Sequence, residues 1–192
     1  TQVESGFKYN SPKYAFTITP FFSNINEQNA DVTENKVYLM EFQSYGAELE
    51  GSTHLGHFNA TAGATITKST ILKSLDATEV GKTPRRVPLL MYNFNPSYSF
   101  GKADIGLSFI GTTDVYSQND NKIVLPGYLY VNAFASYSIT KGLVLSANVN
   151  NLFNALGLTE AEGTTFVDNS TNYMRARSIT GRSSRLSLTY SF

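Results

Sequence analysis

The sequence predicts an all-β protein, an antiparallel meander of about nine strands that forms part of a transmembrane β-barrel. Three observations support this fold class. Apolar residues recur with a period of two, which places successive side chains on opposite faces of a strand. Short and long connections alternate along the chain. One face of most strands is apolar, whereas the other carries hydroxyl and amide groups and a few charges.

The expected strands cover residues 2–10, 13–23, 36–54, 57–72, 89–100, 103–116, 127–140 and 143–150, followed by a last strand that ends at Phe192. The clearest is 127–140, where Leu129 and Val131 alternate with Tyr128 and Asn132. In strand 36–54 the apolar phase slips near Gln43 and Ser44, which indicates a β-bulge. Residues 70–80 are a weak helix candidate and the only one.

The connections differ in length in a regular way. Short ones are expected at Ser11-Pro12, Leu55-Gly56, Gly101-Lys102 and Lys141-Gly142, and long ones at about 24–35, 73–87, 117–126 and 155–181. In an antiparallel meander, alternate connections lie at opposite ends of the sheet. All short turns are therefore expected at one end and all long loops at the other, an asymmetry typical of outer-membrane barrels.

The two faces of the strands fit the same fold. Strands of about 12 residues are long enough to cross a hydrocarbon layer, which needs about 9–11. The apolar face is expected to contact lipid and the polar face to line a wet lumen. Aromatic residues near the short-turn end would form an interfacial girdle: Tyr9, Tyr14, Tyr98, Phe100, Tyr137, Tyr190 and Phe192. A β-sandwich core with scattered aromatic residues is the alternative.

Composition excludes several functional classes. The chain has 15 basic and 15 acidic residues, so nucleic acid is not expected as a partner. It has no cysteine, which excludes disulfides, thiolate metal sites and cysteine nucleophiles. No spacing of residues suggests a catalytic triad or a carboxylate pair, so neither enzymatic activity nor a cofactor is expected. His54 and His57 flank a short turn without a third ligand, and no metal site is expected there.

The C-terminal part of the sequence carries a specific motif. Asn150-Asn151-Leu152-Phe153-Asn154 ends a strand, and Gly181-Arg182 precedes a last strand with Tyr190 and Phe192. Over about residues 126–192 this closely resembles the C-terminal end of TonB-dependent outer-membrane receptors. Thr83-Pro84-Arg85-Arg86-Val87-Pro88 is a looser likeness.

In that family 22 strands surround an N-terminal plug domain. The resemblance implies that residues 1–192 are the C-terminal portion of such a barrel, with roughly its last nine strands. Nothing in the sequence resembles a plug or a TonB box. The first residues show no signal peptide, so we expect the sequence to start inside a longer chain.

The resemblance also implies a function and partners. The protein would lie in the outer membrane of a Gram-negative bacterium. It would import a large, scarce solute, such as a ferric siderophore, a cobalamin-like ligand or an oligosaccharide. The energy for this import would come through TonB acting on the plug. Expected partners are outer-membrane lipid and lipopolysaccharide, the remaining strands and plug of the same receptor, TonB, and the barrel-assembly machinery, which would read the C-terminal strand with Tyr190 and Phe192.

Such receptors bind their solute with the outer loops and the nearby inner wall. The candidates are Tyr116, Tyr128 and Tyr130 on the inner face and Arg175 and Arg177 in the last loop. Tyrosine rings stack on sugars or aromatic chelates, and arginine binds carboxylate or phosphate. Two other functions stay open: a small self-contained barrel of eight to ten strands acting as a pore or adhesin, and a soluble carbohydrate-binding β-sandwich.

Overall fold

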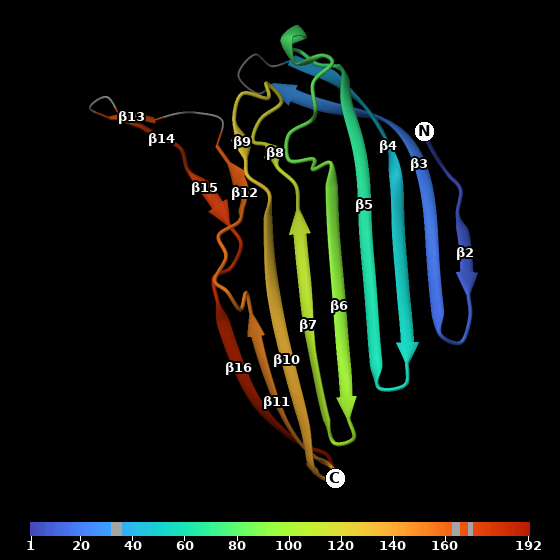
Figure 1. Cartoon of the computed structure of the whole chain (residues 1–192). Helices are drawn as coiled ribbons and strands as arrows, with labels where there is room; N and C mark the ends of the chain where they lie inside the picture. Colours follow the sequence, from blue (N-terminus) through green and yellow to red (C-terminus); the bar gives the residue numbers. More distant parts are fainter. Residues whose placement is uncertain (32–35, 163–165, 169–170) are drawn as a thin grey trace.

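The computed structural model describes residues 1–31, 36–162, 166–168 and 171–192. Its main sheet is an antiparallel meander (Figure 1). β1 (Gln2–Glu4) and β2 (Phe7–Asn10) both pair with β3 (Tyr14–Asp31), so they form one interrupted strand. The sheet continues through β4 (Lys36–Leu55), β5 (Phe58–Lys73), β6 (Leu90–Phe100), β7 (Ala103–Thr112), β10 (Tyr128–Thr140), β11 (Leu143–Asn150) and β16 (Ser183–Tyr190). The predicted all-β meander of nine strand positions is confirmed.

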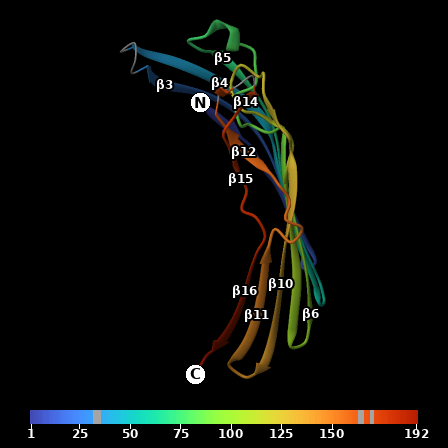
Figure 2. The same cartoon turned by 90° about the vertical axis from the view of Figure 1, so that its left-hand side faces the viewer.

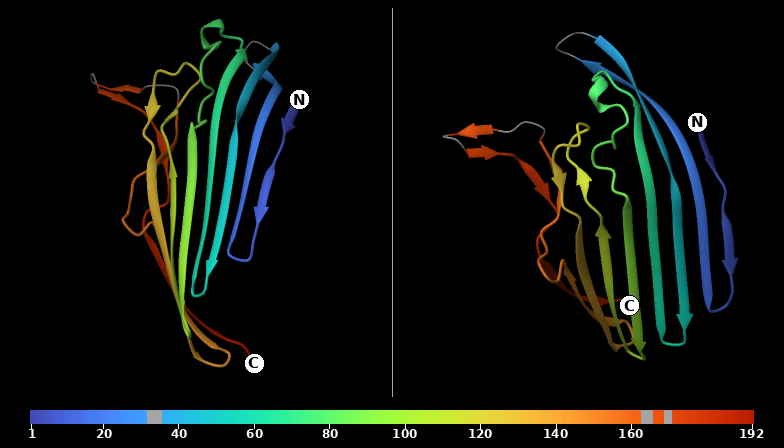
Figure 3. Two further views of the ribbon diagram at one scale, coloured as in Figure 1. Left: turned by 45° about the vertical axis from the view of Figure 1, so that its right-hand side comes forward. Right: turned by 45° about the horizontal axis from the view of Figure 1, so that its top comes forward.

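Shorter elements occupy the long connections. β8 (Val115–Tyr116) pairs with β9 (Val124–Leu125), β12 (Leu158–Ala161) with β15 (Ala176–Ser178), and β13 (Phe166–Asp168) with β14 (Thr171–Tyr173). Figure 3 shows from two directions that these ribbons lie at one end of the sheet, away from the tight turns. Three of those turns have a glycine at positive φ: Gly56, Gly101 and Gly142. The predicted end-to-end asymmetry therefore holds.

The weak helix candidate at 70–80 is wrong. β5 runs to Lys73, and only the single-turn 3₁₀ helix η1 (Ala77–Glu79) follows, with the side chain of Asp76 accepting a hydrogen bond from the Thr78 N–H. Thr70 and Ile71 alternate in burial as strand residues, because Ile71 packs inward and is fully buried. In the part of the chain that the structure describes, no helix has the length and apolar character needed to span a membrane.

The β-bulge predicted at Gln43-Ser44 is also wrong. β3 and β4 pair without a shift from Tyr14 opposite Thr53 to Asp31 opposite Lys36, so the predicted long connection 24–35 is largely a strand ribbon. A register shift does occur between β4 and β5, but its extra residue is Leu72 of β5.

The apolar phase changes because the surroundings of β4 change. Tyr45 shares the outer face with Leu49, and beyond Tyr45 that face carries Gln43 and Glu41. At this level the inner face also becomes apolar, with Phe42, Met40 and Tyr38 lying against the loop after β5, while Leu39 and Val37 remain on the outer face. The alternation of apolar residues in β4 therefore changes phase without an inserted residue in this strand.

The two faces of the sheet differ as predicted. Directly opposed residues of neighbouring strands share a face. One outer row consists of Leu49, Ala64, Tyr92, Gly111 and Leu129. One inner row consists of Ser52, Thr61, Asn95, Ser108 and Asn132. The inner row is linked by hydrogen bonds, from Asn95 Nδ2 to Thr61 Oγ1 at 3.2 Å and from Ser108 Oγ to Asn95 Oδ1 at 2.6 Å.

The sheet is a single curved wall (Figure 2). Among the described residues no second layer covers its apolar face, which argues against a β-sandwich. All seven predicted girdle aromatics are at least 40% exposed near the tight-turn end, which fits a lipid interface. The sheet does not close within this chain, because β1 and β2 at one edge and β16 at the other each have one neighbour. Much of the small buried core, such as Ile71 and Leu125, lies under the loops.

Candidate functional site

Hydrogen bonds interlock two of the long loops. Asn121 Oδ1 accepts from the Thr83 N–H at 3.0 Å, and Asn121 Nδ2 donates to the Thr83 carbonyl at 2.7 Å, as a neighbouring strand would. The Arg85 N–H donates to Asn119 Oδ1 at 2.9 Å. Asn121 has φ of 55°, a left-handed conformation that asparagine tolerates better than most residues. The β5–β6 and β7–β10 loops therefore form one body.

The β11–β16 loop contacts this body through an ion pair of Glu160 in β12. Its carboxylate lies 3.1 Å from Arg86 and 3.7 Å from Arg177 of β15. Next to it, Gln118 Nε2 donates to the Ala161 carbonyl at 3.3 Å. Ion pairs this exposed contribute at most about 1 kcal/mol each, so their main effect is to fix the position of the β12–β15 ribbon.

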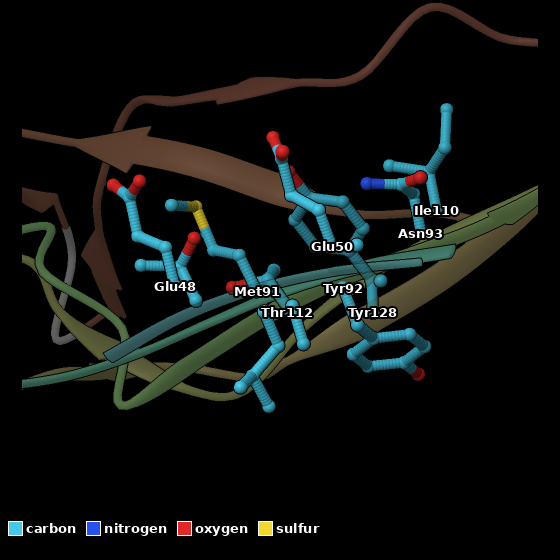
Figure 4. Close-up of a pocket in the computed structure, with 13 residues that line it drawn as sticks. Glu48, Glu50, Met91, Tyr92, Asn93, Ile110, Thr112 and Tyr128 are labelled. Atoms are coloured by element: carbon cyan, nitrogen blue, oxygen red, sulfur yellow. The ribbon is translucent and has the colours of Figure 1, made fainter. Parts of the chain in front are cut away.

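Below the loops, the inner wall contains a cavity of about 440 Å³ (Figure 4). A row of residues crosses five strands at this level: Glu48, Thr65, Met91, Thr112 and Tyr128. The next row includes Glu50, Asn93 and Ile110. Figure 4 shows Glu48, Glu50 and Met91 projecting from the same side of the sheet. This wall can hydrogen-bond a polar molecule or a protein surface that enters the lumen, and its carboxylates favour positive charge.

Tyr128 and Tyr130 are brought together on this face, with ring centroids 6.3 Å apart. Tyr128 also lies against Gly157, where a Cβ would fall 2.5 Å from a ring carbon. The loop after β11 therefore covers part of the Tyr128 ring and requires glycine at that point. Tyr130 lines a smaller cavity of about 260 Å³ together with Asn132 and Ile179.

The other three predicted ligand-binding residues lie elsewhere. Tyr116 belongs to the β8–β9 ribbon, outside the main sheet, and its carbonyl accepts from the Arg86 N–H at 2.8 Å. Arg177 is engaged with Glu160, and Arg175 precedes β15, where its carbonyl accepts from the Glu162 N–H at 2.9 Å. None of the three lines the wall cavity. The five candidates therefore lie in separate parts of the loop end, and a role for them in ligand binding stays a prediction.

Comparison with known proteins identifies the fold. The family model described as "TonB dependent receptor-like, beta-barrel" matches residues 1–152. The chain belongs to this family. No curated protein matches it significantly.

Several solved receptor barrels have the same fold. The siderophore receptor PiuA from Acinetobacter baumannii superimposes with a TM-score of 0.79 at 20% identity, covering 98% of this chain and 28% of its own. The ferric citrate transporter FecA without ligand has a TM-score of 0.81 at 16% sequence identity, and the match covers 100% of this chain and 31% of FecA. The ferric yersiniabactin uptake receptor FyuA from Yersinia pestis has a TM-score of 0.80 at 16% sequence identity, and the match covers 100% of this chain and 29% of FyuA. The chain thus spans about three tenths of the length of these solved receptors.

In this TonB-dependent receptor barrel, the Asn150–Asn154 motif makes a backbone-binding turn. Asn151 is 2% exposed, and its Nδ2 donates to the carbonyls of Ala155 at 2.9 Å and Thr180 at 3.1 Å. Its Oδ1 accepts from the Ala155 N–H at 2.8 Å. Asn150 Nδ2 donates to Ser183 Oγ at 3.3 Å. The motif thus connects the end of β11 to the start of β16.

The rest of the motif completes this junction. The Leu152 N–H donates to the Val131 carbonyl at 2.7 Å, while Phe153 is 73% exposed. Asn154 Oδ1 accepts from the Arg182 N–H at 2.9 Å and would lie 3.4 Å from a Cβ on Gly181. Gly181 is not among the glycines at positive φ, so the left-handed conformation does not explain glycine at this position. At the end of the chain, the rings of Tyr190 and Phe192 lie 6.3 Å apart.

Sequence reasoning missed the residues that hold the receptor loops together. Asn121 and Glu160 were not singled out, although Asn119-Asp120-Asn121 is a typical turn sequence. Their partners Thr83 and Arg86 lie in the segment that showed the looser family likeness. The pairing spans 38 residues for Asn121 and Thr83, and no local pattern indicates it.

Proposed function

We propose that the chain is the C-terminal portion of a TonB-dependent receptor barrel in the outer membrane of a Gram-negative bacterium, and that the receptor imports a large, scarce solute such as a ferric siderophore or an oligosaccharide. The observation that carries this proposal is the wall itself. It has a polar inner face, an apolar outer face that no second layer of the described residues covers, and its described long connections at the end opposite the tight turns. The similar solved receptors are named for siderophores, ferric citrate and ferric yersiniabactin, which favours a ferric chelate.

In this proposal the chain has an architectural role. Its outer face contacts lipid and lipopolysaccharide, its open edges pair with the remaining strands, and its inner face meets the plug through which TonB acts. The interlocked loops and Tyr128 and Tyr130 form part of the path of the solute. Catalysis is not part of this role.

The function is tested by uptake with the whole receptor. In a strain lacking its other iron receptors, labelled ferric siderophores should enter when TonB is present and fail to enter when it is deleted. The Tyr130→Ala receptor should bind the transported chelate about threefold to tenfold more weakly, because a stacking surface is lost. Uptake that persists without TonB would instead support a self-contained pore.

The assembly role of the last strand is tested separately. Phe192 is fully exposed in this chain and follows β16, whose outer edge has no partner here. Deleting Phe192 should lower the amount of folded receptor in the outer membrane severalfold, as measured by heat-modifiable migration on a gel. Ser191→Ala, which leaves the aromatic ring of Phe192 in place, is the matched control. Equal levels of the two variants would count against the assembly role.

A further inference from the structure

A second cavity, of about 590 Å³, lies at the outer rim, away from the wall cavity. Its floor is apolar and comes from the inner face of β4: Tyr38, Met40 and Phe42. The β5–β6 loop forms the opposite side with Leu75 and Pro84. Figure 1 shows η1 of this loop beside the far ends of β3 and β4. The cavity thus lies where a solute approaching the lumen from the loop end would pass.

Well-defined contacts hold this cavity open. The Ile71 N–H donates to the Lys82 carbonyl at 2.9 Å, and the Gly81 N–H donates to the Ile71 carbonyl at 2.8 Å, so the loop folds back on β5. Ile71 is fully buried and Met40 is 7% exposed beneath the loop. Asn121 holds Thr83, next to Pro84, in place. The cavity is therefore a built feature with both of its sides fixed.

The charges around the cavity are mostly negative. The carboxylates of Glu27, Asp76 and Glu79 line it, against the single guanidinium of Arg85. Lys82 and Lys122 are near Asp76. Lys122 forms a 3.7 Å ion pair with Asp120, whereas Lys82 donates a 3.0 Å hydrogen bond to the neutral Asp120 carbonyl and keeps its charge. The three carboxylates of the cavity still outnumber the two cations, Arg85 and Lys82. Hydrogen bonds from Thr78 lower the pKa of Asp76, so its carboxylate stays ionised at neutral pH.

Aromatic rings and carboxylates together favour one kind of ligand. The face of a tyrosine or phenylalanine ring attracts a cation through its quadrupole, and the same groups pack against apolar carbon. Carboxylates at the rim favour positive charge and disfavour anions. Among common organic groups, an ammonium or guanidinium on an apolar body meets both conditions.

We propose that this rim cavity, between the floor of Tyr38, Met40 and Phe42 and the carboxylates of Glu27 and Glu79, binds an ammonium- or guanidinium-bearing apolar group of the imported solute. The inference rests on the proposed function, because it places a subsite on the path of that solute. Glu27 is the best residue to test, since it lies on β3 opposite Met40 and forms no ion pair with another described residue.

The experiment compares two probes with one ring system and opposite charges, 2-(1-naphthyl)ethylammonium and 1-naphthylacetate. Binding to the purified whole receptor in detergent is followed by naphthalene fluorescence. The ammonium probe should bind more tightly, and Glu27→Gln should weaken its binding about fivefold, with 1-naphthylacetate unaffected or improved. Glu41→Gln, which removes a carboxylate from the outer face of β4 instead, is the matched control and should leave binding of the ammonium probe unchanged.

Tighter binding of the acetate probe, or equal binding of the ammonium probe to the wild type and Glu27→Gln, would overturn the inference. Heat-modifiable migration of each variant confirms that the barrel is folded. Failure here is distinguishable from failure of the proposed function, because TonB-dependent uptake does not enter the probe measurement. Uptake that depends on TonB, combined with no preference for the ammonium probe, would overturn the subsite alone.

Discussion

Replacing Ala147 with arginine should destabilise the folded receptor by about 2–3 kcal/mol, because the new charge would face lipid. Ala147 lies on the outer face of β11 between Ala135 and Leu186, so no polar group is beside it in the sheet. The measurement is the free energy of unfolding of the whole receptor, from urea titration in lipid vesicles, with the folded fraction read from heat-modifiable migration.

Ser146→Arg is the matched control, one residue away and on the opposite face. Ser146 lies between Ser136 and Ser187, and Ser136 Oγ donates to Asp104 Oδ2 at 3.3 Å. A long cation there meets a polar wall and a nearby carboxylate, so we expect a cost below about 1 kcal/mol. Equal costs at the two positions would contradict the assignment of the outer and inner faces.

The second large effect is expected at Asn151. Changing it to alanine removes the side-chain hydrogen bonds to Ala155 and Thr180 and leaves their backbone groups without partners. At about 1 kcal/mol for each of three bonds, the turn should lose about 3 kcal/mol of local stability. The residue also has φ of 48°, where alanine is strained by about 1 kcal/mol more.

Hydrogen exchange of the amides of Leu152 and Ala155 in the whole receptor measures this loss. Asn151→Gly separates the two causes, because glycine accepts the positive φ but makes no side-chain hydrogen bond. We expect Asn151→Gly to be destabilised less than Asn151→Ala by about 1 kcal/mol. If both variants exchange at the wild-type rate, the side chain of Asn151 does not hold this junction.

The strands could be predicted because their signal is local. A strand with one face in lipid and one in water must alternate, and this alternation is visible in segments such as 127–140 and 103–116 without knowledge of their partners. The second was predicted too long, because β7 ends at Thr112. The motif at Asn150–Asn154 was equally visible. The bulge assigned to Gln43-Ser44 failed because a change of phase has two causes, an extra residue or a change of surroundings, and a single strand does not distinguish them.

The site was less predictable. Tyr128 and Tyr130 share the inner face as expected, since the period of the strand determines that. Tyr116, Arg175 and Arg177 were assigned by their place in long loops, and the loops fold into ribbons whose direction depends on contacts such as those of Glu160 with Arg86. Asn121 and Thr83, and the rim cavity they help to hold, were not predicted at all.

The sequence alone determined the number and order of the strands, which face of each strand is apolar and the end of the sheet that carries the long loops. Each of these follows from periodicity and connection length along one stretch of chain. Only the tertiary structure decided which loops interlock, which carboxylates form ion pairs and which do not, and where cavities form. These depend on single hydrogen bonds and close approaches between residues far apart in sequence, such as Asn121 with Thr83 and Gly157 with Tyr128, and no period along the chain encodes them.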